Sequence, residues 1–202
     1  MKRVAGILSV ILVLAAFVSP VAAASISGDS SAYVHPYPSG IVQGDLVFGH
    51  SEGVTDWVIP GFWTHVGIIG WYDSGIGDWI VIEATTSNGV TFTPLSKFLS
   101  RYDTVAIGRV ITADATIRYY AAYFAYLQYG KPYNWNYLSK PDIYSDSYYC
   151  SQLVWAAYMW ASGYSINIDE NDGAWSWTYG YAVAPQEVYD DPEVSIIYYH
   201  SV

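Results

Sequence analysis

Residues 148–158 read Tyr-Tyr-Cys-Ser-Gln-Leu-Val-Trp-Ala-Ala-Tyr, and this stretch does most to decide the fold. Its apolar residues recur at helical spacing, and Gly163 follows as a stop signal, so we expect a helix from about residue 150 to residue 162. Ser147 is a candidate N-cap. Cys150 would then lie at the start of the helix, where free N–H groups and the helix dipole lower the pKa of a thiol and can hold an oxyanion.

Elsewhere in the chain, short runs of β-branched and aromatic residues are bounded by turn residues, which is typical of β-strands. We expect strands at 45–48, 65–71, 79–84, 89–93, 104–110 and 195–199, a helical turn within 94–100, a long helix at 114–128 and a short helix at 186–189. Strands come mostly before helices along the chain. This order is typical of an α+β fold with an antiparallel sheet or a small barrel packed against helices.

The first 24 residues predict a secretory signal peptide. Lys2 and Arg3 precede an apolar stretch over residues 6–18, and three alanines at 22–24 form a small-residue cleavage site. The stretch is short for a membrane anchor, which is the alternative. We therefore expect cleavage before Ser25, an irregular segment at 25–41 and one domain at 42–202. The protein would be secreted or cell-surface bound, with no membrane span after cleavage.

Composition excludes some classes of function. The 202-residue chain has 18 acidic and 8 basic residues, for a net charge of −10. Nucleic-acid binding needs clustered cations, so no nucleic-acid partner is expected.

The chain is unusually rich in aromatic residues, with 21 tyrosines and 9 tryptophans. They would mostly fill the core, although they could also line a groove for sugars or peptides. A non-catalytic module that binds glycans or peptides through these rings is therefore an alternative.

Cys150 is the single cysteine of the chain, so it has no partner for an internal disulfide. In an exported protein, a lone cysteine is a free thiol or part of an intermolecular bridge. It could equally be a small buried apolar residue.

His65 and Glu83 are candidates for a base and its orienting carboxylate. His65 lies early in one expected strand, and Glu83 lies near the end of the next. If these strands form a hairpin with Trp71 opposite Trp79 or Gly77, His65 and Glu83 share a face as a direct or diagonal pair. A register one residue off would separate them. A structural role for the histidine, satisfied by a hydrogen bond in the core, is the alternative.

Together these segments resemble the circularly permuted NlpC-type cysteine hydrolases, the YiiX-like group of papain-like enzymes. The resemblance extends from about Val42 to Tyr189. It rests on six short motifs in the family's order: Gly44-Asp45-Leu46-Val47, Thr64-His65-Val66-Gly67-Ile68, Ile82-Glu83-Ala84, Gly130-Lys131-Pro132-Tyr133-Asn134-Trp135, Tyr149-Cys150-Ser151-Gln152-Leu153-Val154 and Val183-Ala184-Pro185.

The resemblance implies a papain-like fold in which Cys150 is the nucleophile, His65 the base and Glu83 the third residue of the triad. We expect Tyr133, Trp135 and Tyr149 to contact the substrate. The implied reaction is hydrolysis of an amide, such as a cell-wall or surface peptide, through a thioester acyl-enzyme. It needs no metal or organic cofactor.

Two other reactions remain open. A lipid or ester acyl hydrolase or acyltransferase could use the same triad. A glycosidase could instead use the carboxylates of Asp45 and Glu83, and it would survive the loss of Cys150.

Overall fold

The computed structural model describes residues 32–51 and 60–202, which form one compact unit from Ala32 to the C-terminus. The predicted signal peptide lies outside the described residues. None of the helices in the described part of the chain is both long and apolar enough to cross a bilayer.

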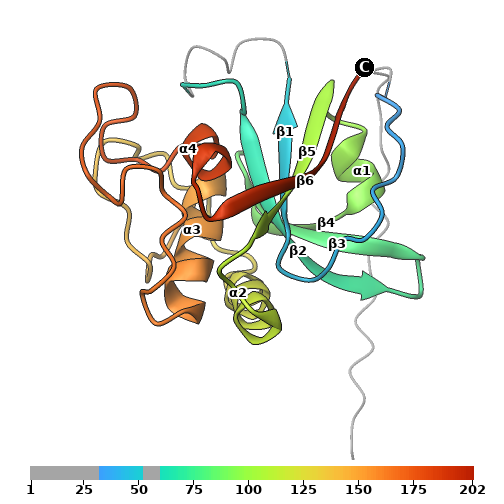
Figure 1. Ribbon diagram of the computed structural model, residues 1–202, viewed down its shortest axis with the longest axis horizontal. Coiled ribbons are helices and arrows are strands. Elements are labelled where there is room, and N and C mark those ends of the chain that lie inside the picture. Colours follow the sequence, from blue (N-terminus) through green and yellow to red (C-terminus); the bar gives the residue numbers. More distant parts are fainter. Residues whose placement is uncertain (1–31, 52–59) are drawn as a thin grey trace, which may run out of the picture. The chain divides into compact units, whose positions relative to one another are not determined.

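The centre of the structure is a six-stranded antiparallel sheet in the order β4-β3-β2-β1-β5-β6 (Figure 1). The strands are β1 (Leu46–His50), β2 (His65–Asp73), β3 (Asp78–Thr85), β4 (Gly89–Pro94), β5 (Thr104–Val110) and β6 (Val194–Ser201). β4 and β6 are the two edge strands and do not pair with each other, so the sheet is open and does not close into the barrel that was one of the two expected forms. The α+β class is confirmed.

Helices cover one face of the sheet. Helices α2 (Ala115–Leu127) and α3 (Cys150–Ala161) pack against the strands and against each other, and α4 (Pro185–Asp190) lies beside them (Figure 1). The main core forms here because alternate strand residues such as Phe48, Ile68 and Ile82 point to this side. α2 begins where expected, since Asp114 accepts a hydrogen bond from the Ile117 N–H at 2.8 Å.

A second, smaller core lies on the opposite face, under helix α1 (Leu95–Leu99). It contains the remaining alternate residues, including Ile69, Val81 and Phe98. The segment 32–41 runs along this side of the molecule, and its Tyr33 N–H donates to the Ser100 carbonyl at 3.1 Å. The two cores explain why most strands are buried on both faces.

The pairing of β2 with β3 contains a one-residue irregularity. Tyr72 pairs with Trp79 near the hairpin turn, but Ile68 pairs with Ile82 further along, so a β-bulge lies between. Next to the turn, the expected pairing of Trp71 with Trp79 is therefore one residue away from the observed one, whereas beyond the bulge the register that it implies, with Ile68 opposite Ile82, is the observed one. The bulge is the physical reason, because it places two residues of one strand opposite one of the other.

One expected cap is wrong. Helix α3 has Tyr149, not Ser147, at its N-cap position. The Gln152 side chain reaches back to accept from the Tyr149 N–H at 3.4 Å, as the third residue of a capping box does.

Candidate active site

Cys150 is the first residue of α3 and is almost fully buried. Gln152 fixes the loop in front of it, because Asn134 donates to its side-chain oxygen at 3.0 Å and its amide donates to the Asp142 carbonyl, also at 3.0 Å. The polar loop 132–148 is thereby tied to the start of the helix. The helix N–H groups at this end have no partners within the helix, so they can receive an oxyanion formed at a group bonded to Cys150.

His65 is the first residue of β2, and it lies beside Glu83, which is near the end of the neighbouring strand β3. His65 Nε2 is 2.6 Å from Glu83 Oε2, and the carboxylate is fully buried. The predicted contact between the two side chains is therefore present. Because Nε2 is engaged by the carboxylate, Nδ1 is the nitrogen left for the Cys150 thiol.

Arg101 completes this group from the connection between α1 and β5. Its Nη2 donates to both oxygens of Glu83, each at 2.8 Å. A buried carboxylate needs such donors to remain charged. Arg101 therefore keeps Glu83 ionised and fixed in place opposite His65.

Aromatic rings hold the imidazole from the α1 side. The Tyr102 ring stacks on His65 with centroids 5.9 Å apart and an interplanar angle of 16°, and Phe98 lies 5.7 Å away. This arrangement depends on Gly49, because a Cβ there would lie 2.4 Å from the Tyr102 ring. The missing side chain of Gly49 therefore makes room for the ring that packs on the base.

The environment favours the charged forms of the thiol and the imidazole. Burial alone would raise the pKa of Cys150, but the neighbouring His65 and the Val66 N–H lower it overall. Burial likewise opposes the charged form of His65, yet the Cys150 thiolate and Glu83 raise its pKa to about 9. The two shifts describe a thiolate–imidazolium pair, which is the nucleophilic state of a cysteine enzyme.

Glu83 is the anion that supports this pair. Burial would raise its pKa, but His65 and Arg101 together hold the pKa of the carboxyl at about 2. Glu83 is therefore charged throughout the neutral range, when it can stabilise the imidazolium as the third residue of a triad does.

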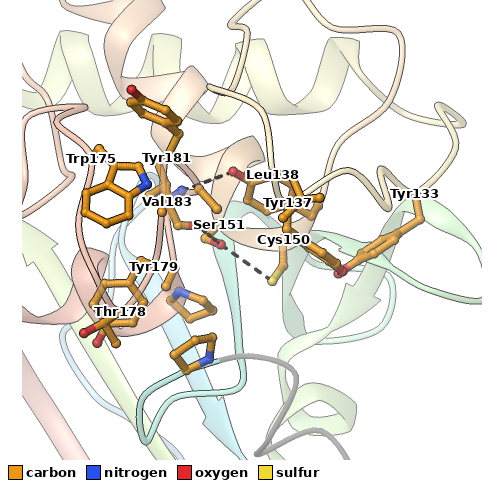
Figure 2. Close-up of a pocket in the computed structure, with 16 residues that line it drawn as sticks. Tyr133, Tyr137, Leu138, Cys150, Ser151, Trp175, Thr178, Tyr179, Tyr181 and Val183 are labelled. Carbon is orange, nitrogen blue, oxygen red and sulfur yellow. Dashed lines mark hydrogen bonds between the residues drawn. The ribbon is translucent and has the colours of Figure 1, made fainter.

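Two cavities flank the Cys150–His65 pair. The first, which we call the aromatic cavity, has a volume of about 320 Å³ and is lined by Cys150, Tyr133, Tyr149 and residues of the 175–185 segment. The second, the hydroxyl cavity, has a volume of about 540 Å³ and is lined by His65, Tyr133 and Thr side chains. In the view of Figure 2 the Cys150 sulfur lies between Tyr133 on one side and Trp175 and Tyr179 on the other.

Of the three residues expected to contact the substrate, two line a cavity beside Cys150 and one does not. Tyr133 lines both cavities and Tyr149 lines the aromatic cavity. Trp135 lines neither of them, and it is 66% exposed with its ring edge against Tyr133. Its role in binding stays a prediction.

The position of Asp45 argues against the alternative of a glycosidase that uses Asp45 and Glu83. Arg109 binds its carboxylate through two hydrogen bonds of 2.8 and 2.7 Å, and the Val42 N–H donates to it as well. Asp45 is fully buried and lines neither cavity at the Cys150–His65 pair. It lacks the access to substrate that a glycosidase carboxylate needs.

Sequence reasoning missed Arg101 and Tyr102. Arg101 is one of only eight basic residues in the chain, and its position directly after a helical turn was the one available signal. Tyr102 is one of 21 tyrosines, so nothing in the sequence distinguishes it. Within residues 32–51 and 60–202, no group of three or more His, Cys, Asp or Glu side chains is arranged to hold a metal ion.

Comparison with family models and comparison with solved structures both found matches. Residues 41–198 match the family described as permuted papain-like amidase enzymes, YaeF/YiiX, C92 family. The fold is similar to the crystal structure of the metalloprotein YiiX from Escherichia coli O157:H7, with a TM-score of 0.61 and 20% sequence identity over 79% of this chain and 98% of that one. Comparison with the curated proteins found no match.

The family match spans more than half of the chain, and its boundaries enclose every strand and helix that carries the site. The predicted resemblance is thus confirmed at the level of family and of papain-like fold. This chain belongs to the permuted papain-like amidase family YaeF/YiiX, a family of cysteine hydrolases.

Proposed function

We propose that this protein is an exported cysteine amidase in which Cys150 is the nucleophile, His65 the general acid and base, and Glu83 the residue that orients His65. The observation that carries the proposal is the position of Cys150 at the first residue of α3, beside the buried His65–Glu83 hydrogen bond of 2.6 Å. A thiol in such surroundings is activated both by the imidazolium and by the helix start.

The reaction follows from these positions. The Cys150 thiolate attacks the amide carbonyl carbon, and the resulting oxyanion is held by N–H groups at the start of α3. As the carbon–nitrogen bond breaks, His65 gives its proton to the departing amine. Water, deprotonated by the now neutral His65, then attacks the thioester and releases the acid and the free thiol. Glu83 stays ionised and holds the imidazole in place throughout.

The substrate of this amidase would be a peptide or acyl amide of the cell envelope or surface, if the first 24 residues act as a signal peptide. An ester substrate is the second candidate, favoured by the absence of charged side chains among the described residues that line the cavity next to Cys150. The two candidates share the acyl-enzyme. They are distinguished by comparing an amide and an ester that have the same acyl group.

Thiol reactivity tests the proposal. Iodoacetamide should label Cys150 rapidly at about pH 6, where an ordinary thiol with a pKa near 8.5 is almost wholly protonated. C150A should abolish hydrolysis, and H65A should abolish hydrolysis and slow the labelling. H200A is the control that removes another histidine, because His200 contacts His35 and lines neither cavity, so its loss should change neither hydrolysis nor labelling. Labelling that follows an ordinary thiol titration and ignores His65 would overturn the proposal and leave a binding module.

A further inference from the structure

The two cavities beside the Cys150–His65 pair differ in chemistry, and the difference bears on the substrate. The aromatic cavity includes Cys150 in its lining, whereas the hydroxyl cavity includes His65. Tyr133 contributes to both and so marks the boundary between them. Both volumes fall in or near the roughly 300–1,000 Å³ range of small-molecule sites.

The aromatic cavity is suited to an uncharged group. No Asp, Glu, Lys or Arg side chain among the described residues lines it, and its walls include Tyr137, Leu138 and Trp175. Several of its polar atoms already have partners within the protein. The Tyr137 hydroxyl donates to that of Tyr133 at 2.9 Å, and the Tyr149 hydroxyl accepts from the Val183 N–H at 3.1 Å. A charged group placed here would lose its hydration without gaining a counter-ion.

The hydroxyl cavity is suited to an anion. Lys97 and Arg101 line it together with Thr, Ser and Asn side chains, and no Asp or Glu of the described chain does so. Lys97 is exposed and forms no ion pair with another described residue. The Nη2 atom of Arg101 binds Glu83, while its buried Nε has no hydrogen-bond partner among the described residues. This cationic lining stands out in a chain with a net charge of −10.

The direction of the reaction decides which part of the substrate enters each cavity. The acyl carbon bonds to the Cys150 sulfur, so the acyl group remains on the side that Cys150 lines. The amine nitrogen takes its proton from His65, so the leaving group departs on the side that His65 lines. The acyl group therefore occupies the aromatic cavity, and the amine occupies the hydroxyl cavity.

From this arrangement we infer that the substrate is an amide joining an uncharged apolar or aromatic acyl group to an amine that carries a carboxylate, which faces Lys97 in the hydroxyl cavity. This inference rests on the proposed amidase function. The same chemistry is present in an N-acyl amino acid with a hydrocarbon chain and in a peptide with an aromatic residue before its C-terminal residue.

Four amides test the inference with the exported protein. N-decanoyl-glycine and N-decanoyl-glycinamide differ only in the charge of the amine part, and N-succinyl-glycine places a charge on the acyl part. N-acetyl-phenylalanyl-glycine represents the peptide source. We expect kcat/KM for N-decanoyl-glycine to exceed those of the glycinamide and succinyl compounds by roughly tenfold or more, in line with charge-assisted recognition. The faster of the decanoyl and phenylalanyl substrates identifies the source.

Two lysine variants test whether Lys97 causes the preference for a carboxylate on the amine part of the substrate. K97Q should reduce the ratio of kcat/KM for N-decanoyl-glycine to kcat/KM for N-decanoyl-glycinamide by roughly three- to tenfold. The effect is modest because an exposed cation contributes less than a buried one. K140Q removes the same charge near Gly173, at a residue that lines neither cavity, and should leave the ratio unchanged. A ratio near one in the unmodified protein, a preference for the succinyl compound, or a K97Q ratio equal to that of the unmodified protein would overturn the inference.

A separate measurement distinguishes a wrong substrate assignment from a wrong assignment of the amidase function. Cys150 alkylation at pH 6 and the burst of p-nitrophenol from p-nitrophenyl acetate need neither cavity to be filled. A reactive thiol and a burst, together with ratios near one, would retain the amidase and reject the inferred substrate. An inert thiol without a burst would reject the amidase itself.

Discussion

Glu83 meets His65 because the pairing between their strands shifts by one residue. Near the hairpin turn Tyr72 pairs with Trp79, and if this register continued, Glu83 would face the side of the sheet opposite to His65. After the bulge, Ile68 pairs with Ile82, which puts Glu83 across from Gly67 and on the face of His65. The hydrogen bond of 2.6 Å between the two side chains follows from this shift.

Replacing Glu83 should therefore affect catalysis through His65. We expect E83Q to lower kcat/KM by roughly 10- to 100-fold, because the amide keeps the shape of the side chain but loses the charge that supports the imidazolium. The His65 pKa, held at about 9 in part by Glu83, should fall in this variant. The measurement is the pH dependence of Cys150 alkylation. If the alkaline part of the alkylation profile lies at the same pH in E83Q and in the unmodified protein, Glu83 does not raise the pKa of His65.

The pH dependence of turnover follows from the two opposed pKa shifts. The active state holds Cys150 deprotonated and His65 protonated. It is lost on the acid side when the thiolate gains a proton, at a pH below the usual thiol pKa, and on the alkaline side when His65 loses its proton near pH 9. We expect a bell-shaped profile of kcat/KM between these limits. A single rise centred at the ordinary thiol pKa would contradict it.

Arg101 should be needed for both stability and activity. R101Q removes one of the two cationic partners of the buried Glu83 carboxylate, so we expect a loss of about 3 kcal/mol in the free energy of unfolding and reduced kcat. R109Q is the matched control. It breaks the equivalent pair with the buried Asp45, away from the cavities, and should reduce stability while kcat is retained in the folded fraction. Equal kcat in the two variants would argue against a positioning role for Arg101.

Acid stability should depend on Glu83. Its pKa is lowered from an ordinary value of 4.5 to about 2, so its stabilising contribution is complete above pH 4.5 and is lost as the pH falls through 2. In E83Q this part of the acid transition should be absent. Urea unfolding between pH 2 and pH 6 measures it, and identical pH dependence for both proteins would refute the assignment.

Gly49 should be essential because of the ring beside it. In G49A the new Cβ would lie 2.4 Å from the Tyr102 ring, so the ring must move away from His65. We expect a large loss of kcat and of thermal stability. The double variant G49A/Y102A should regain stability relative to G49A while kcat stays low. Activity in G49A close to that of the unmodified protein would show that the stacked ring does not position the base.

The extent to which this structure could be predicted differs between its parts. The strand and helix positions followed from local patterns, and the start of the helix at Cys150 was within one residue of the expected one. The cap at Ser147 was wrong because the actual cap depends on Gln152, which also binds residues of a loop. The catalytic roles of Cys150, His65 and Glu83 remain predictions until variants are measured.

Local sequence patterns were enough to predict the order of strands and helices, the position of a lone cysteine at a helix start, and the family motifs. These depend on residues that are close together in the chain, where propensity and periodicity act directly. The tertiary structure was needed to find the open sheet, the bulge in the pairing of β2 with β3, the Arg101 and Tyr102 contacts, and the two unlike cavities. These arise from pairings between residues far apart in the chain, and no local pattern encodes the register or the packing that brings such residues together.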